Sequence, residues 1–122
     1  MRSKRRDPET LLPLTPAMFH VLIALADGEM HGYAVIKDIS RRTDGRLRLS
    51  AGTLYALIRR FVAEGVVEES DIRPAPSLDD ERRRYYRLTD FGRDVARAEA
   101  DRLEQLIGMA RAKQLVPSPR RA

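Results

Sequence analysis

The side chains in this sequence that could support catalysis do not form a complete active site. His20 lies in a nearly all-apolar segment and is expected to pack, and His31 precedes a glycine where it is expected to pack or cap a helix. Ser50 and His31 could be combined with an aspartate into a triad, but Ser50 already has a sufficient role as a helix cap. The chain has no nucleophile elbow, phosphate-binding glycine loop or metal-ligand spacing, and the acids at 79–81 resemble a solvated turn. We therefore expect no enzyme, no cofactor and no metal.

A cluster of arginines suggests a different chemistry, the binding of phosphate groups in nucleic acid. Residues 41–60 contain six arginines and a single acid, Asp44, and the part from Ser50 to Ile58 is uncharged. Arginines neutralise phosphates, and an uncharged helix end can approach the edges of the bases. The segment therefore suggests a DNA-binding surface. An ordinary surface helix is the alternative when the segment is considered alone.

The residues from Leu49 to Val67 must form the helix that positions this surface. Ser50 suits the N-cap, and Gly65 suits a left-handed C-terminal cap. An apolar stripe at helical spacing predicts the buried face: Leu54, Leu57, Ile58 and Phe61. The opposite, DNA-facing side is predicted to hold Gly52, Ala56 and Arg59, flanked by Thr53, Tyr55 and Arg60.

Two helices are expected before this one. Thr15-Pro16 is a strong helix start, and the apolar run up to Ala26 predicts a helix in the core, ended by Asp27-Gly28. A second helix is predicted from His31 to about Thr43, ended by Asp44-Gly45. Two short helices with a glycine-containing break between them are typical of a helix-turn-helix.

A pair of strands is expected after the helix that begins at Ser50. A first strand should run from Val66 to about Ile72, and a second from Arg82 to Leu88 after a loop with two prolines. Alternation in the second strand places Arg84, Tyr86 and Leu88 on one face, and Arg83, Tyr85 and Arg87 on the other. A hairpin after a helix-turn-helix is a wing. The predicted fold is therefore mainly α with a small β-hairpin, a winged helix-turn-helix.

A long C-terminal helix is expected from Thr89, its cap, to about Leu115, a length of about 38 Å. Phe91 and Val95 are expected to pack on the body of the same chain. The helix is too long for a body of this size to cover, so its far part predicts contact with a second subunit. The expected dimer contacts are Leu103, Leu106, Ile107 and Ala110, with the partner's first helix beside them at Leu14 and Met18.

Composition fits one folded domain. The chain has 122 residues, of which 43% are hydrophobic, and a net charge of +5. Residues 1–10 and 117–122 each carry +2, which leaves +1 for residues 11–116, so a DNA surface must be a local patch. With no cysteine and no apolar run long enough to span a membrane, we expect a cytoplasmic protein with no membrane partner.

The predicted organisation has four parts. Residues 1–13 form a flexible basic arm, for which a solvated tail is the alternative to phosphate contact, and residues 14–88 form the winged helix-turn-helix. Residues 89–115 form the dimerisation helix, and residues 116–122 form a flexible tail.

Three sequence blocks in this order, HGYAVIKDI, LSAGTLYALIRRFVAEGVVE and RYYRLTDFG, resemble the PadR family of bacterial winged-helix transcriptional regulators. The resemblance covers roughly Leu12 to Leu115, and a single C-terminal helix is similar to the short subfamily. It implies a homodimeric repressor on double-stranded DNA, and it raises a small-molecule effector as an open alternative, because some members of the family lose DNA on binding a small aromatic or drug-like ligand. The implied DNA-binding residues are Tyr33, Ser50, Gly52, Thr53, Tyr55 and Arg59, with Arg83 and Arg84 of the wing near phosphate; Arg60 joins them from the helix pattern.

Two features depart from the family. The wing turn carries the acids Asp79-Asp80-Glu81, which phosphate would repel, and the chain has no tryptophan with which to stack a flat ligand. The rival interpretation is a winged helix that binds another protein through Tyr33 and Tyr55. A salt-sensitive shift of promoter DNA separates the two, because phosphate contacts release counterions.

Overall fold

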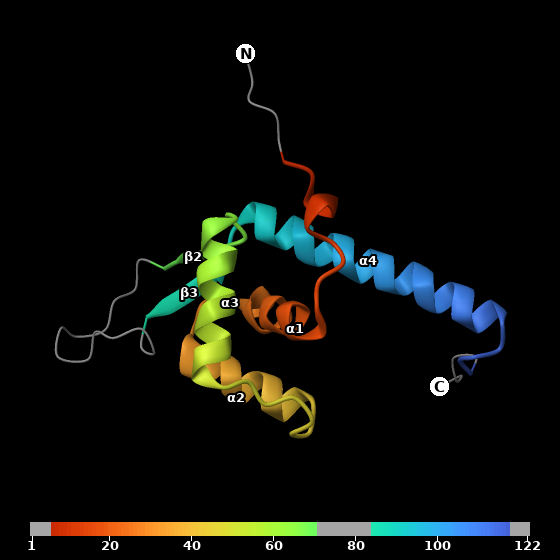
Figure 1. The fold of residues 1–122 in the computed structure, drawn as a ribbon, viewed down its shortest axis with the longest axis horizontal. Helices are drawn as coiled ribbons and strands as arrows, with labels where there is room; N and C mark the ends of the chain where they lie inside the picture. Colours follow the sequence, from red (N-terminus) through yellow and green to blue (C-terminus); the bar gives the residue numbers. More distant parts are fainter. Residues whose placement is uncertain (1–5, 71–83, 118–122) are drawn as a thin grey trace, which may run out of the picture.

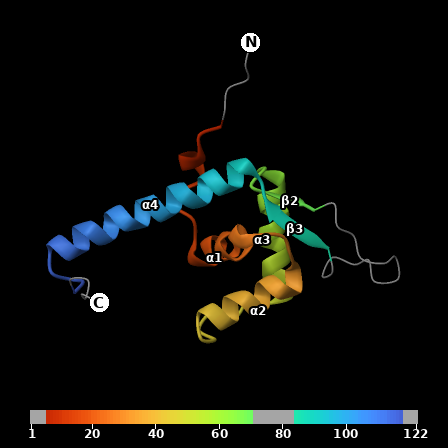
Figure 2. The same ribbon diagram turned by 180° about the vertical axis from the view of Figure 1, so that it is seen from behind.

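The computed structural model describes residues 6–70 and 84–117, which form a small helical body and one helix that projects from it (Figure 1). The body contains α1 (Pro16–Ala24), α2 (Gly32–Arg42), α3 (Ala51–Ala63) and a small sheet. The projecting helix is α4 (Asp90–Ala112). The sheet lies at the opposite end of the molecule from the free end of α4 (Figures 1 and 2).

Helix α1 is the centre of the core, as its apolar sequence predicts. Thr15 caps it by accepting from the Met18 amide at 3.2 Å, and Pro16 is its first residue. It ends in a short 3-10 helix, η2 (Leu25–Asp27), and Gly28 follows at a φ of 148°. Val21 and Leu22 of this helix are fully enclosed, so α1 supports the helices that carry the exposed surface.

Helices α2 and α3 are joined by a turn in left-handed backbone conformation. Asp44 has a φ of 53° and Gly45 a φ of 76°, which ends α2 where the sequence predicts. Ser50 then caps α3 by accepting from the Thr53 amide at 3.1 Å. Gly65, at a φ of 76°, ends this second helix of the motif, also as predicted.

The sheet has three antiparallel strands rather than the predicted two. β3 (Tyr85–Leu88) lies in the middle, with β2 (Val67–Glu69) on one side and β1 (Met30–His31) on the other. Val67 pairs with Leu88, and Met30 pairs with Tyr86. The sequence does not reveal β1, because two residues are too few to show alternation. The mainly α winged-helix fold is nevertheless confirmed.

Helix α4 is joined closely to the end of α3. Thr89 caps α4 by accepting from the Gly92 amide at 2.8 Å, and its hydroxyl donates to the Gly65 carbonyl at 2.5 Å. Gly92 itself lies directly against the Val66 carbonyl oxygen, where an added Cβ would overlap that atom. Val95, one turn later, is fully buried in the body, as predicted.

The described part of the N-terminal arm is packed against the body, contrary to the prediction for residues 1–13. A 3-10 helix, η1 (Pro8–Leu11), lies against α4 (Figures 1 and 2). The Arg6 guanidinium donates to the Glu64 carbonyl at 2.6 Å and lies 5.3 Å from the centre of the Phe91 ring. The apolar side chains Leu11 and Leu12, which pack on the core, explain why this stretch is not a solvated tail.

Candidate nucleic-acid interface

The first turns of α3 present an exposed surface of small side chains. Gly52, Thr53 and Ala56 are all exposed, and a Cβ added at Gly52 would meet no atom within 4 Å. The Ser50 hydroxyl donates to the Thr53 hydroxyl at 3.0 Å while it caps the helix. This end of α3 can therefore approach another molecule closely without rearrangement.

Tyr55 is buried, and its predicted place on the exposed side of α3 is wrong. Its side chain is 6% exposed and its ring lies against Gly32, where an added Cβ would overlap the ring. The missing side chain of Gly32 makes the room that the ring fills. A side chain so enclosed offers almost no surface to DNA. The available signal was the glycine in the first turn of a helix, a position where glycine is costly without a packing reason.

Tyr33 lies on the first turn of α2, at the surface of the body. Its side chain is 52% exposed, and the Lys37 ammonium stands 5.5 Å from its ring centre in a cation–π contact. An exposed aromatic ring paired with a cation is suited to contact a polar or anionic surface.

The predicted arginines differ in how strongly the protein itself engages them. Arg59 and Arg60 are exposed at the later turns of α3, and Arg60 lies 3.6 Å from the Glu64 carboxylate. Arg84 lies 3.9 Å from the Glu69 carboxylate at the base of the wing. Arg83 and the acids at 79–81 lie outside the described residues.

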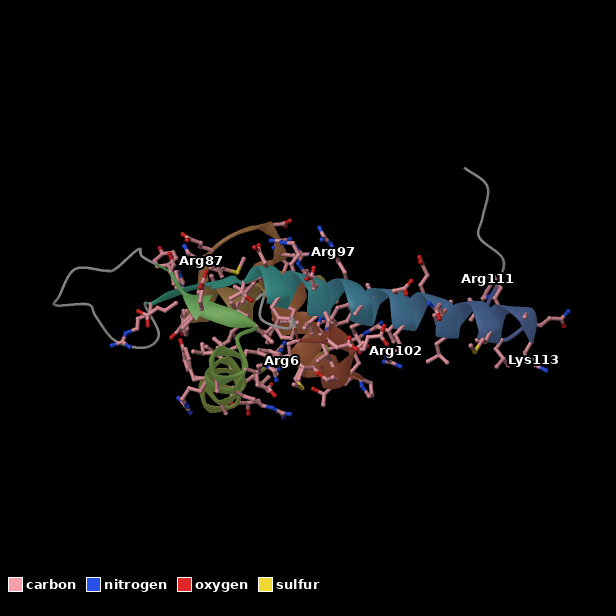
Figure 3. The ribbon with its side chains drawn as sticks, turned by 90° about the horizontal axis from the view of Figure 1, so that it is seen from above. Arg6, Arg87, Arg97, Arg102, Arg111 and Lys113 are labelled. Carbon is pink, nitrogen blue, oxygen red and sulfur yellow. The ribbon has the colours of Figure 1, made fainter. Side chains whose placement is uncertain are left out.

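The base of the wing is held by a polar cluster that the sequence analysis did not anticipate. Arg87 donates to Glu68 at 2.8 Å and to Glu29 at 3.0 Å, and Ser70 donates to Glu29 at 2.7 Å. The hydrogen bonds to Glu29 hold the pKa of its carboxyl below the ordinary value, and the bond from Ser70 has the largest effect, followed by the bond from Arg87. Arg87, which Figure 3 labels at the sheet end of the molecule, is therefore engaged by two acids of the protein itself.

The predicted dimer contacts divide into two groups. On α4, Leu106 is 51% exposed, Ile107 is also exposed, and Leu103 and Ala110 are half-buried. Leu14 and Met18 are each 7% exposed because they belong to the core of the chain itself. They offer little area to a partner, so their assignment to a dimer interface is not supported by their burial.

A buried carboxylate fastens α4 to the start of α1. Glu99 is 1% exposed, and it accepts from the Arg102 guanidinium at 2.6 and 3.1 Å and from the Leu14 amide at 3.1 Å. The hydrogen bonds from Arg102 are the main cause that holds the pKa of this carboxyl below its ordinary value. Arg102 lies one turn later on the same helix, but the sequence gives no signal for the Leu14 contact, because that residue lies 85 positions away in the chain.

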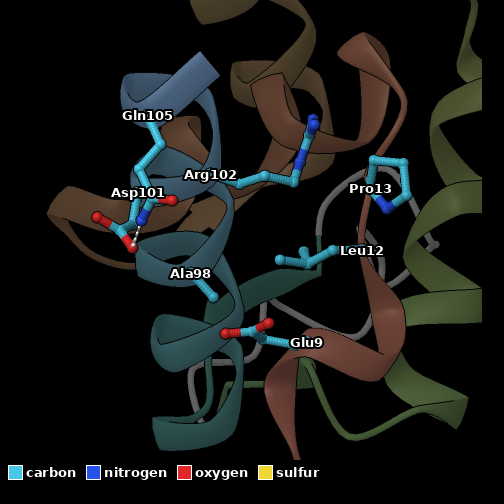
Figure 4. Close-up of a pocket in the computed structure, with 7 residues that line it drawn as sticks. All are labelled: Glu9, Leu12, Pro13, Ala98, Asp101, Arg102 and Gln105. Atoms are coloured by element: carbon cyan, nitrogen blue, oxygen red, sulfur yellow. Dashed lines mark hydrogen bonds between the residues drawn. The ribbon is translucent and has the colours of Figure 1, made fainter. Parts of the chain in front are cut away.

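A hollow of about 290 Å³ lies between the N-terminal segment and α4 (Figure 4). Its lining mixes acids, a cation and apolar groups: Glu9, Leu12, Pro13, Ala98, Asp101, Arg102 and Gln105. Gln105 donates to Asp101 at 2.9 Å. Across residues 6–70 and 84–117 no group of three acidic or histidine side chains could hold a metal ion. Every helix in those ranges is too short or too polar to cross a membrane.

Comparison with known proteins gives consistent matches. Residues 21–98 match the Transcriptional regulator PadR-like family. The transcriptional regulator Rv3488 of Mycobacterium tuberculosis is 35% identical over 88 residues, which cover 71% of this chain and 75% of that protein.

Two solved structures show the same fold. A transcriptional regulator from Clostridium thermocellum has a TM-score of 0.66 at 23% identity, over 78% of this chain and 89% of that one. Bacillus subtilis PadR, solved in complex with operator DNA, has a TM-score of 0.59 at 20% identity. That match covers 75% of this chain and 48% of the Bacillus subtilis protein.

Proposed function

The chain belongs to the PadR-like family of transcriptional regulators, and we propose that it is a homodimeric repressor that binds a pseudo-palindromic operator. Membership in a family of transcriptional regulators agrees with the expectation that the chain is not an enzyme. The Bacillus subtilis relative of similar fold binds operator DNA. In this chain the observation that carries the proposal is the exposed front of α3, where Gly52 and Thr53 leave the helix backbone accessible.

The proposed contacts divide into groove and phosphate contacts. Gly52 and Thr53 enter the major groove, since residues near the start of a recognition helix reach the base edges. Phosphate contacts come from side chains around this front: Tyr33, Ser50, Arg59, Arg60 and Arg84, with Arg83 of the wing added from the sequence. Tyr55 supports the helix from below because it is buried.

The proposed dimer forms through the distal half of α4. Val95 and Glu99 lie buried on one side of the helix, and Leu103, Leu106 and Ala110 continue that side beyond the body. A second copy would bury this exposed apolar stripe. A two-fold pair can place two recognition helices one helical turn apart, about 34–36 Å, on one face of DNA.

Substitution of Leu106 by aspartate tests the dimer. Leu106→Asp should give a monomer by light scattering that no longer shifts operator DNA, because each half alone makes too few contacts. Ala112→Asp adds the same charge at an exposed position that lies away from Leu106 and should remain dimeric. A dimeric Leu106→Asp protein with full operator binding would remove this part of the proposal.

A small-molecule effector that releases the operator is the last part of the proposal. The hollow beside α4 involves Arg102, which also holds Glu99, so a molecule bound there would act on the attachment of α4 to the body. Release of the operator by such a molecule is the expected consequence. Titration of small molecules into the complex of the protein with operator DNA measures this release.

The DNA-binding proposal is tested at Gly52. Gly52→Glu should preserve or raise the melting temperature, because a Cβ at this exposed position meets no atom within 4 Å and an acid suits the first turn of a helix. It should abolish the gel shift, since it places a negative charge in the groove. The matched control is Gly108→Glu, an equally open position on α4, which should retain binding.

The DNA for this test is the upstream region of the protein's own gene, examined by footprinting and by gel shift at several salt concentrations. Binding that weakens steeply with salt supports the proposal, because each phosphate contact releases counterions. Wild-type protein that binds a partner protein but gives no salt-sensitive shift would instead favour a protein-interaction module.

A further inference from the structure

The segment between α2 and α3 presents two arginines beside the start of α3. Arg46, Arg48 and Ser50 are exposed. Leu47 and Leu49, which alternate with them, are half-buried and pack against the core. A period of two is the pattern of an extended chain, in which every second side chain lies on the same face. Both arginines therefore share the face on which Ser50 begins the recognition helix.

Hydrogen bonds fasten this segment to the end of α2. The Gly45 amide donates to the Ser40 carbonyl at 2.7 Å, and the Arg46 amide donates to the Thr43 carbonyl at 3.0 Å. The Thr43 hydroxyl accepts from the Leu47 amide at 3.1 Å. Because the backbone is already ordered, binding through this segment costs little conformational entropy.

The arginines of this segment differ from those of α2 in their ionic partners. Arg41 and Arg42 donate to the buried carboxylate of Asp38 at 2.6 and 2.8 Å. Arg46 and Arg48 make no salt bridge and no side-chain hydrogen bond with the residues that the structure describes. The protein thus engages two arginines of this region internally and leaves two exposed on one ordered face.

We infer that Arg46 and Arg48 form a phosphate clamp, which holds the sugar-phosphate backbone of duplex DNA at the edge of the groove that α3 enters. The inference rests on the proposed function and extends it to two arginines of the 41–60 cluster that are not among the predicted contact residues. Alternate residues of an extended chain stand about 6.6 Å apart, so the two guanidinium groups can reach separate phosphates of one strand. Contacts of this kind position a protein on DNA without reading sequence.

The test is the salt dependence of binding by the double variant Arg46→Ala/Arg48→Ala. The slope of log K against log salt is negative, and each lost phosphate contact should reduce its magnitude by about 0.9. The double variant should therefore reduce the magnitude by about 2. Affinity for operator and for unrelated duplex DNA should fall by similar factors. The thermal melt should be unchanged, because both side chains are exposed.

The matched control removes the same charge elsewhere. Arg97 and Arg111 are exposed on α4, away from the recognition helix (Figure 3). Arg97→Ala/Arg111→Ala should keep the wild-type salt slope. A second variant, Arg46→Lys/Arg48→Lys, keeps both charges and should retain most of the slope, which separates charge from any effect on folding.

The outcomes separate this inference from the proposed function. Wild-type protein that binds operator DNA, together with a double alanine variant of unchanged slope, overturns the clamp and leaves the proposed function intact. A double variant with an altered sequence preference also overturns it, because the arginines would then read bases. Wild-type protein with no salt-sensitive binding overturns both.

Discussion

Replacement of Gly92 by alanine should destabilise this protein, although the same replacement normally stabilises a helix. Gly92 lies in the first turn of α4, and its Cα faces the carbonyl oxygen of Val66. An added Cβ would overlap that oxygen, which cannot turn away as the tip of a flexible side chain can. The same carbonyl accepts from the Thr89 amide at 3.1 Å and from the Thr89 hydroxyl at 3.2 Å. A shift that relieves the overlap therefore also strains the cap of α4.

The two opposing effects have different sizes. Alanine is favoured over glycine in a helix by about 1 kcal/mol. Forcing a methyl group into a filled site typically costs about 1–3 kcal/mol, and the upper part of this range suits a clash with backbone. The net loss for Gly92→Ala should therefore be about 1–2 kcal/mol, which lowers the melting temperature by about 5–10 °C.

Gly108→Ala provides a control in the same helix. A Cβ at Gly108 would meet no atom within 4 Å, so only the helix preference remains, and the melting temperature should stay constant or rise. Thermal unfolding followed by circular dichroism compares the two variants with wild type. If Gly92→Ala melts at or above the wild-type temperature, α4 does not approach the Val66 carbonyl as closely as described and the reasoning is refuted.

Two further predictions concern buried polar and aromatic groups. Glu99→Gln should reduce stability at neutral pH by about 1–3 kcal/mol, whereas Glu104→Gln on the exposed side of α4 should have little effect. Because the Glu99 pKa is held below its ordinary value of 4.5, the contribution of this carboxylate to the free energy of unfolding is present above that pH and is lost as the pH falls through the lowered pKa. Urea unfolding between about pH 7 and pH 3 should show this loss of stability in wild type and less of it in Glu99→Gln. Tyr55→Ala should cost about 3–5 kcal/mol because the ring is buried, whereas Tyr33→Ala should stay within about 0.5 kcal/mol; equal melting temperatures for the two variants would contradict the burial of Tyr55.

The features that the sequence predicted correctly depend on neighbours in the chain. Ser50, Thr15 and Thr89 cap their helices, and Gly45 and Gly65 end them, because a cap needs only a side chain and an amide three residues away. The apolar stripes of α2 and α3 follow from helical periodicity alone. The order of these elements was then sufficient to predict the winged helix.

The features that the sequence did not reveal depend on contacts between distant segments. Glu99 meets the Leu14 amide across 85 positions of the chain, and no local pattern records such a pair. Tyr55 was assigned to the exposed side because it lies beside the stripe of α3, yet Gly32 on another helix creates the space for its ring. Leu14 is apolar in either setting, so its sequence could not distinguish the core from a dimer interface.

The burial of Tyr55 changes what the exposed face of α3 can recognise. With that ring inside, the residues that face outward along the helix are Gly52, Ala56, Arg59 and Ala63, with Thr53 beside them. Small side chains on this line allow the helix backbone close to the floor of a groove, but they carry few hydrogen-bonding groups. If α3 enters DNA as proposed, few base contacts are then possible, and Thr53 is the side chain placed to make them. Much of the discrimination among operators must then come from DNA shape, held in register by phosphate contacts on either side of α3.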